Sequence, residues 1–247
     1  MDIGTAKPST AEQEYIQHHL IDVIEPNDRL SAAKFKQLAV SSIEQISERG
    51  KVPFLVGGSG LYIDSVIYDY DFPPEADVTI RLELESMSDE ALRERLIETD
   101  EAGFLDTDLT NRRRVMRALE TANVPRLRRD TVLPTTIVIG LTMNKEVAQQ
   151  RIIQRIEKML KEGFIDEVRQ IGLIYGPDSE AMNIIGYRAF RDVVFGTKSV
   201  ADGVADFVAG DIALYKKQIT WFKRNSEIHW LENPADADGL VRNFLAG

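Results

Sequence analysis

The sequence predicts an α/β protein in which helices flank a parallel sheet and a helical subdomain is inserted into the chain. Two observations predict this class. Apolar segments at 52–56 and 135–143 have the composition of buried strands, and segments of helical period follow each of them, as in parallel sheets. Between the two, residues 78–120 are charged, helical in period and without a convincing strand, which indicates the insertion.

The composition is that of a soluble globular protein. Of its 247 residues, 43% are hydrophobic and 28% are charged. The absence of cysteine excludes disulfides and thiolate metal sites and favours a reducing compartment. No apolar run reaches the roughly 18 residues of a membrane span, so we expect no membrane segment.

The net charge of −10 argues weakly against a nucleic-acid partner, but binding depends on local basic patches. Three such patches occur, at 112–117, 126–129 and 216–224, while acidic residues gather within 75–108. Each patch taken alone is as compatible with a solvated face as with a binding surface.

The first part of the chain predicts a helix, a strand and a second helix. Ser31 is a suitable N-cap and Gly50 a suitable stop for a helix over 31–49. The strand over 52–56 then leads into the turn 57–60 and an apolar helix. Two prolines within 70–77 interrupt this pattern.

The inserted segment and the remainder of the chain predict further helices. Ser88 or Asp89 is expected to cap one helix of the insertion, and residues 111–120 form another. After the strand over 135–143, a helix runs from about 145 to 162 and ends at Gly163. Helices are also expected at 164–175, 186–195 and 200–224, and the segments 227–231 and 235–246 close the chain.

These boundaries predict two domains. Residues 1–74 and 132–247 form the α/β core, and residues 75–131 form the inserted helical subdomain. On the helix over 145–162, four charged residues share one face because they are spaced at i, i+4, i+7 and i+11: Arg151, Arg155, Lys158 and Glu162.

The turn Gly57-Gly58-Ser59-Gly60 has two interpretations. Such turns before a helix bring backbone N–H groups close to an anion, and Ser59 adds a hydroxyl. A nucleotide-binding P-loop also needs Gly-x4-Gly-Lys-Ser/Thr, which occurs nowhere in this sequence. On the residues alone, a tight strand-to-helix turn is the favoured interpretation.

Other polar residues do not by themselves select a reaction. His18 and His19 are adjacent, so on a strand they would point to opposite faces, and we expect no metal site there. Three aspartates are candidate bases, and nothing in their spacing distinguishes them: Asp2, Asp22 and Asp64. For Arg155, the residues alone favour a surface ion pair over a diphosphate clamp.

Seven strings, in order along nearly the whole chain, resemble the tRNA dimethylallyltransferases of bacterial type. They are MDIGTAKP (1–8), HHLIDVIEP (18–26), PFLVGGSGLYI (53–63), NRRRVMRALE (111–120), RIEKMLKEGFIDEV (155–168), IIGY (184–187) and KKQITWFKR (216–224).

This resemblance implies a reaction and a fold. Such enzymes transfer the dimethylallyl group of dimethylallyl diphosphate to N6 of adenosine 37, just 3′ of the tRNA anticodon, with release of diphosphate and help from Mg²⁺. The implied fold is similar to P-loop kinases, with a helical insertion that grips the anticodon stem-loop. The target base is flipped into a channel, as base-modifying enzymes require. A cytoplasmic monomer is the expected state.

The resemblance also assigns roles to residues of this sequence. Ser59 is expected near the target adenosine, and Arg155 is expected to hold the diphosphate, in place of the surface ion pair. The expected tRNA contacts are Arg81, Arg113, Arg114, Val115, Met116 and Arg117. The basic residues expected near phosphate are Lys216, Lys217, Lys223 and Arg224.

The sequence also departs from the family pattern. The family's P-loop and the aspartate expected as general base precede the MDIGTAKP string in related proteins and do not occur here. The regions 82–100 and 121–134 also look shorter than usual. We therefore expect a truncated chain, or one with internal gaps, that is nearly inactive as printed although its parent protein is an enzyme.

Three alternatives remain open. An adenylate isopentenyltransferase would act on free AMP and would not need a helical insertion that grips tRNA. A catalytically inactive tRNA-binding remnant would bind RNA without turnover. A kinase of the same fold class would release ADP instead of diphosphate.

Overall fold

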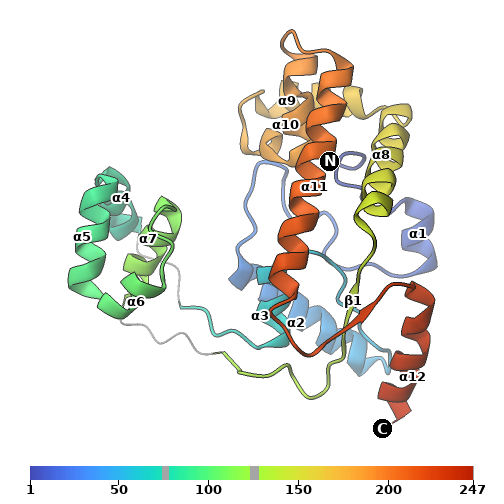
Figure 1. The fold of residues 1–247 in the computed structure, drawn as a ribbon, viewed down its shortest axis with the longest axis horizontal. Coiled ribbons are helices and arrows are strands. Elements are labelled where there is room, and N and C mark those ends of the chain that lie inside the picture. The colour runs from blue at the N-terminus through green and yellow to red at the C-terminus, as the bar shows by residue number, and fades with distance from the viewer. Residues whose placement is uncertain (74–77, 123–127, 247) are drawn as a thin grey trace. The chain divides into compact units, whose positions relative to one another are not determined.

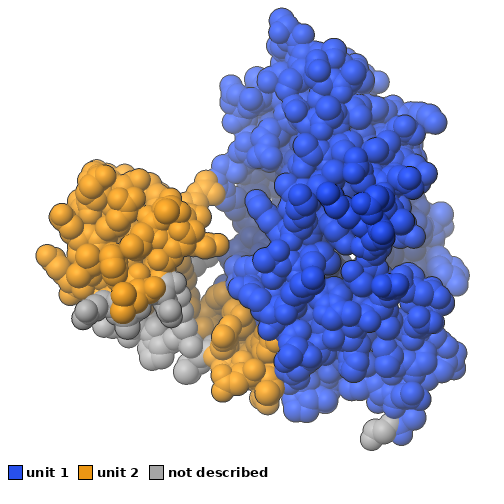
Figure 2. Space-filling view, viewed as in Figure 1, with its two compact units in different colours: residues 1–67, 132–247 blue, residues 68–131 orange. Residues whose placement is uncertain are grey.

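The computed structural model forms two compact units, each with its own hydrophobic core. Unit 1 comprises residues 1–67 and 132–247, and unit 2 comprises residues 68–131 (Figure 2). The residues that the structure describes are 1–73, 78–122 and 128–246.

Helices dominate unit 1 (Figure 1). None of the described helices combines the length and the apolar character needed to cross a bilayer. In chain order the helices of unit 1 are α1 (Thr10–Tyr15), α2 (Ala32–Glu48), α3 (Gly60–Ile67), α8 (Lys145–Lys161), α9 (Phe164–Tyr175), the 3₁₀ turn η1 (Glu180–Asn183), α10 (Ile185–Val194), α11 (Val200–Phe222), the 3₁₀ turn η2 (Pro234–Asp236) and α12 (Ala237–Ala246).

The sheet of unit 1 is small and parallel. Strand β1 (Val138–Leu141) pairs with β2 (Ile228–Leu231), and Val138 lies opposite Ile228. The chain between these strands runs through α8, α9, α10 and α11, so helices make the crossover that a parallel pair requires. The predicted α/β class with a parallel sheet is therefore confirmed, with helices as the larger part.

The strand predicted over 52–56 is wrong. These residues form no regular secondary structure, and Phe54 and Val56 are 70% and 87% exposed. A strand is stabilised by hydrogen bonds to a neighbouring strand, and the described residues place none beside this segment. Apolar composition indicates a preference for the extended backbone but does not supply that neighbour. The other predicted strand, over 135–143, is shortened to β1.

The predicted helices are confirmed to within a few residues, because their end signals are local. The Ser31 hydroxyl accepts the backbone N–H of Lys34 at the start of α2. Gly163 adopts φ of 97°, the left-handed conformation that glycine favours, between α8 and α9. Helix α1 is an addition to the prediction, and its signal is in the sequence: Ser9 and Glu12 form a capping box.

The core of unit 1 lies where α8, α9, α10 and α11 meet. Phe164 at the start of α9 is fully buried, and its ring centroid lies 5.3 to 5.7 Å from those of Tyr187, Phe190 and Phe207. Ile156 and Met159 of α8 belong to the same cluster. This aromatic cluster therefore joins α8 to α9, α10 and α11.

In the described part of unit 2, all regular secondary structure is helical. Its helices are α4 (Val78–Ser86), α5 (Asp89–Thr99), α6 (Glu101–Asp106) and α7 (Arg112–Glu120). The Ser88 hydroxyl caps α5 by accepting the N–H of Ala91. The core of the unit is made of Leu84, Leu92, Leu96, Val115, Met116 and Ala118.

Candidate active site

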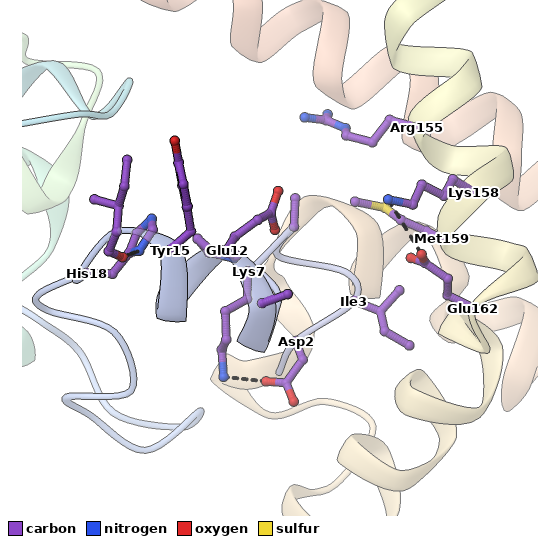
Figure 3. A pocket seen from close by; sticks show the side chains of 14 residues that line it. Asp2, Ile3, Lys7, Glu12, Tyr15, His18, Arg155, Lys158, Met159 and Glu162 are labelled. Atoms are coloured by element: carbon purple, nitrogen blue, oxygen red, sulfur yellow. Dashed lines mark hydrogen bonds and ion pairs between the residues drawn. The ribbon is translucent and has the colours of Figure 1, made fainter.

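A cleft of about 730 Å³ opens between the first eighteen residues and α8 of unit 1. Figure 3 shows Arg155 and Lys158 on α8 extending toward the opposite wall, which carries Glu12 and Tyr15 of α1. One wall comprises Asp2, Ile3, Ala6, Lys7, Pro8, Ala11, Glu12, Tyr15, Ile16 and His18, and the other comprises Arg155, Lys158, Met159 and Glu162.

The α8 wall follows from helical period. Of the four charged residues predicted to share one face of this helix, Arg155, Lys158 and Glu162 line the cleft, while Arg151 does not. Lys158 and Glu162 form an ion pair with 3.6 Å between Nζ and Oε1. Met159, one position along, also lines the cleft and at the same time belongs to the buried cluster beneath it.

Arg155 is held from behind by Asp211 of α11. Its Nη2 donates a hydrogen bond to Oδ2 of Asp211, whose side chain is 8% exposed, while the Arg155 side chain is 47% exposed. A guanidinium has five N–H donors, so this bond leaves donors available for an anion. The ion pair that the residues alone favour is thus present, and the diphosphate role remains a prediction.

Lys7 organises the other wall. Its ammonium group is paired with the carboxylates of Asp2 and Asp22. The hydrogen bond from Lys7 lowers the pKa of Asp2, and the same contact, followed by that to Asp22, raises the pKa of Lys7. Two of the three candidate bases, Asp2 and Asp22, are therefore ion-pair partners of one lysine.

The short helix α1 brings Glu12 to the cleft, and the segment that follows it brings His18. Hydrogen bonds from the Ser9 hydroxyl and backbone N–H lower the pKa of Glu12. Nδ1 of His18 lies 2.7 Å from the carbonyl oxygen of Ile16. His19, its neighbour in the sequence, does not line the cleft.

The glycine turn packs against α11. Gly58 lies against Gln218 and Gly60 against the ring of Trp221, so closely that a Cβ on either glycine would overlap these side chains. No glycine of this turn has a positive φ, so close approach is what requires glycine here. This geometry supports a tight turn before α3 rather than a phosphate loop, although residues 52–56 ahead of the turn form no strand.

Ser59 is exposed and does not line the cleft. It immediately precedes α3, where its carbonyl accepts the N–H of Tyr62 and of Ile63 at 3.0 and 3.1 Å. The turn nevertheless contacts α11, the helix that holds Arg155. Gln218 of α11 contacts the turn and Asp211 of α11 contacts Arg155. These two residues are seven positions apart, or about two helical turns, so they lie on the same side of α11. The catalytic role of Ser59 stays a prediction.

Trp221 contacts two further polar residues, Asp64 and Arg224. Its Nε1 donates to Oδ2 of Asp64 at 2.8 Å, which engages the third candidate base. The guanidinium of Arg224 lies 4.1 Å from the Trp221 ring centroid in a cation–π contact. The basic residues predicted near phosphate, Lys216, Lys217, Lys223 and Arg224, are all exposed, and none of them lines the cleft.

In unit 2, the predicted tRNA-contact residues divide into surface arginines and core residues. Arg113 is exposed, Arg114 is paired with Asp108 at 3.2 Å, and Arg117 is paired with Glu120 at 3.1 Å. Arg81 lies 3.5 Å from Glu85 in a further ion pair.

Val115 and Met116 are only 2% and 8% exposed, which corrects the expectation for these two. Their side chains pack inside unit 2 because the period of α7 turns them inward while Arg113 and Arg114 face solvent. Of the basic patch 126–129, Arg126 lies outside the described residues.

The carboxylates of the cleft do not form a metal site by themselves. Among the described residues, no three His, Cys, Asp or Glu side chains are grouped to hold an ion. The three carboxylates of the cleft already have partners: Asp2 binds Lys7, Glu12 binds Ser9 and Glu162 binds Lys158. The residues therefore do not fit a Mg²⁺ ion held by protein ligands alone.

Sequence reasoning missed Glu12 and Tyr15 because it did not identify α1, although the Ser9–Glu12 capping box marks that helix. It also missed Asp211, which the sequence separates from Arg155 by 56 residues. No local signal reports such a pairing.

Comparison with known proteins gives matches along nearly the whole chain. Residues 1–225 match the family model described as IPP transferase. A tRNA dimethylallyltransferase from Bifidobacterium longum subsp. infantis is 39% identical over 260 residues, which cover 100% of this chain and 76% of that relative.

Two solved structures are similar in fold. The full-length tRNA isopentenylpyrophosphate transferase from Bacillus halodurans is 33% identical with a TM-score of 0.72, over 100% of this chain and 83% of that chain. A eukaryotic dimethylallyltransferase acting on tRNA is 21% identical with a TM-score of 0.76, over 93% of this chain and 63% of that chain. The chain therefore belongs to the IPP transferase family.

Proposed function

We propose that this protein transfers the dimethylallyl group of dimethylallyl diphosphate to N6 of adenosine 37 of tRNA and releases diphosphate. In this reaction N6 forms a bond to the allylic carbon, the carbon–oxygen bond to diphosphate breaks, and N6 loses a proton. Negative charge builds on the leaving oxygens, so cationic groups at the diphosphate contribute most to the rate.

The observation that carries the proposal is the guanidinium of Arg155, which extends into the cleft of a member of this family. Asp211 engages one of its nitrogens, and the remaining donors match the oxygens of a diphosphate. Lys158 on the same wall adds a second cation. We infer that the diphosphate lies against α8.

The tRNA is proposed to contact the exposed arginines of unit 2. Arg113, Arg114 and Arg117 extend from α7 as a basic patch, which is the electrostatic signature of a phosphate contact. We propose that Arg81 joins them, that the anticodon stem-loop is the part of the tRNA bound, and that Ser59 lies near the flipped adenosine. Lys216, Lys217, Lys223 and Arg224 are proposed to lie near phosphate.

Several finer proposals accompany this reaction. The sheet and its helices are proposed to belong to a P-loop-kinase-like fold, and the protein is proposed to act as a cytoplasmic monomer. Mg²⁺ is proposed to enter with the donor, because this ion commonly takes substrate phosphates and water as most of its ligands. The cleft contributes cations and orientation.

The experiment compares three acceptors with one another. Each is incubated with the purified full-length protein, radiolabelled dimethylallyl diphosphate and Mg²⁺. The acceptors are an unmodified anticodon stem-loop with adenosine at position 37, the same RNA with guanosine there, and AMP. We expect label in the first RNA alone. Phosphorus NMR of the same reactions is expected to show diphosphate and no ADP.

Each alternative predicts a different result. Label in AMP in preference to the stem-loop would identify an adenylate isopentenyltransferase. Salt-dependent RNA binding without any label would identify an inactive binding protein. Formation of ADP in a reaction that also contains ATP would identify a kinase.

A further inference from the structure

The carboxylate of Glu167 on α9 holds the backbone at the start of the cleft wall. Oε2 accepts the N–H of Asp2 at 2.6 Å and that of Ile3 at 2.9 Å, and Oε1 accepts the N–H of Gly4 at 2.9 Å. The hydroxyl of Tyr187 on α10 donates a fourth hydrogen bond to Oε1. One side chain, 163 to 165 residues away in sequence, thus binds three consecutive amides.

These contacts favour the ionised form of Glu167. Burial alone would raise its pKa, but the bonds from Gly4, Tyr187, Asp2 and Ile3 together outweigh burial and lower it. Burial and the neighbouring carboxylate raise the pKa of Tyr187, so its hydroxyl stays a donor. The anchor is therefore charge-assisted, which makes hydrogen bonds shorter and stronger than neutral ones.

Close packing restricts the same segment from the other side. A Cβ on Gly4 would lie 2.6 Å from Cε2 of Tyr187, so the backbone there lies directly on the aromatic cluster. Phe164 of that cluster contacts Tyr187 edge to face, with 5.4 Å between ring centroids. Residues 2–4 are consequently fixed both by hydrogen bonds and by contact with buried rings.

Both walls of the cleft are thereby attached to the same buried aromatic cluster. Asp2 and Ile3 belong to one wall and follow the Glu167 anchor. Arg155 belongs to the other, on α8, whose residues Ile156 and Met159 are part of the same cluster as Tyr187. Glu167 itself does not line the cleft.

We propose that Glu167 is a positioning residue that sets the distance between the Asp2–Lys7 wall and Arg155, and thereby the affinity for the allylic diphosphate. This inference rests on the proposed function for the identity of the ligand. It assigns Glu167 no contact with the substrate, so its replacement is expected to weaken donor binding more than it slows the chemical step.

The test is the replacement Glu167→Gln in the full-length protein. Glutamine has nearly the same shape, but one carboxylate oxygen becomes an NH₂ group that faces backbone N–H donors. We expect the dissociation constant for dimethylallyl diphosphate, measured by calorimetry without RNA, to rise about ten-fold, as loss of one charge-assisted hydrogen bond implies. The KM for the donor is expected to rise equally, with kcat changed by less than about three-fold.

Two further variants separate positioning from a general loss of stability. Gly4→Ala displaces the same segment from the Tyr187 ring without touching Glu167, and it is expected to raise the donor KM in the same way. Glu157→Gln on α8 removes an exposed carboxylate that does not line the cleft, and it is expected to leave binding unchanged.

Amide hydrogen exchange provides a readout that needs no ligand. In the unsubstituted protein the amides of Ile3 and Gly4 are expected to exchange slowly. In Glu167→Gln they are expected to exchange quickly, while Val168 and Ile171 in the core of α9 keep their protection.

The outcomes distinguish this inference from the proposed function. Equal donor affinity in Glu167→Gln and the unsubstituted protein, or no donor binding by either, overturns the positioning role. Weaker donor binding by Glu167→Gln supports it even if no acceptor RNA is prenylated, a result that would reject only the proposed reaction.

Discussion

At the scale of single residues, Glu167 couples stability to pH. Its pKa in the folded protein lies below the ordinary value of 4.5, so folding favours the ionised form. The contribution of ionised Glu167 to the free energy of unfolding is therefore fully present above pH 4.5, and it is lost as the pH falls through the lowered pKa of the folded protein.

Glu167→Gln is accordingly expected to have a lower free energy of unfolding than the unsubstituted protein at pH 7. At pH 3 the free energies of unfolding of the two proteins are expected to be nearly equal. Urea denaturation at pH 7, 5, 4 and 3 measures this dependence. The Glu157→Gln control is expected to follow the unsubstituted protein throughout. A constant difference between Glu167→Gln and the unsubstituted protein at every pH would contradict the linkage.

Arg155 permits a second prediction at this scale, because a lysine keeps its charge but not its fork of donors. Arg155→Lys is expected to raise the KM for dimethylallyl diphosphate about ten-fold or more, as steady-state kinetics would show. Arg151→Lys, on the same helix but outside the cleft, is the matched control and is expected to be neutral. An unchanged donor KM in Arg155→Lys would remove the guanidinium from the diphosphate site.

At the scale of elements, neighbouring arginines of α7 have different roles. Nη2 of Arg112 donates to the carbonyls of Glu85 and Met87 at 3.0 and 2.7 Å, and so satisfies backbone groups where α4 ends. The side chain of Arg113 is exposed, and among the described residues no hydrogen bond or ion pair engages it. One arginine is structural, and the next is available to an RNA phosphate.

Arg112→Ala is therefore expected to destabilise unit 2 by about 1 kcal/mol, because an exposed and a part-buried carbonyl at the end of α4 lose their donor. Arg113→Ala is expected to leave stability unchanged and to weaken stem-loop binding for all RNA sequences alike. The slope of log affinity against log salt concentration is expected to fall by about one, as for the loss of one phosphate contact. Urea denaturation and fluorescence anisotropy at several salt concentrations measure the two effects. Equal RNA affinity for Arg113→Ala and the unsubstituted protein would exclude this residue from the interface.

At the scale of the whole molecule, the chain leaves and re-enters unit 1 at one place. The N–H of Leu133 donates to the carbonyl of Ile67 at 2.9 Å, and that of Arg129 donates to the carbonyl of Tyr68 at 2.8 Å. The ends of the insertion are thus already held together, so shortening what lies between them costs little loop entropy.

Replacement of residues 69–128 by a short glycine–serine linker is therefore expected to leave unit 1 folded and able to bind dimethylallyl diphosphate. Binding of the anticodon stem-loop is expected to be lost. Circular dichroism, calorimetry with the donor and anisotropy with the RNA test the three expectations. Retained RNA affinity would place the interface in unit 1.

Much of the element structure was predictable because its causes are local. The Ser31 cap, the left-handed Gly163 and the helical spacing of Arg155, Lys158 and Glu162 all act within a few residues of chain. The prediction of a strand over 52–56 was wrong because its cause is not local. A strand depends on a neighbouring strand, which composition does not specify.

The sequence by itself determined most of the helices, the helical insertion and the family, because caps, periodicity and motif order are properties of the chain read in one dimension. Only the tertiary structure decided that Asp211 holds Arg155, that Glu167 anchors residues 2–4, and that α1 faces α8 across a cleft. Those contacts join residues 56 to 165 positions apart. They exist because the buried aromatic cluster brings their helices together, and a local pattern contains no record of that packing.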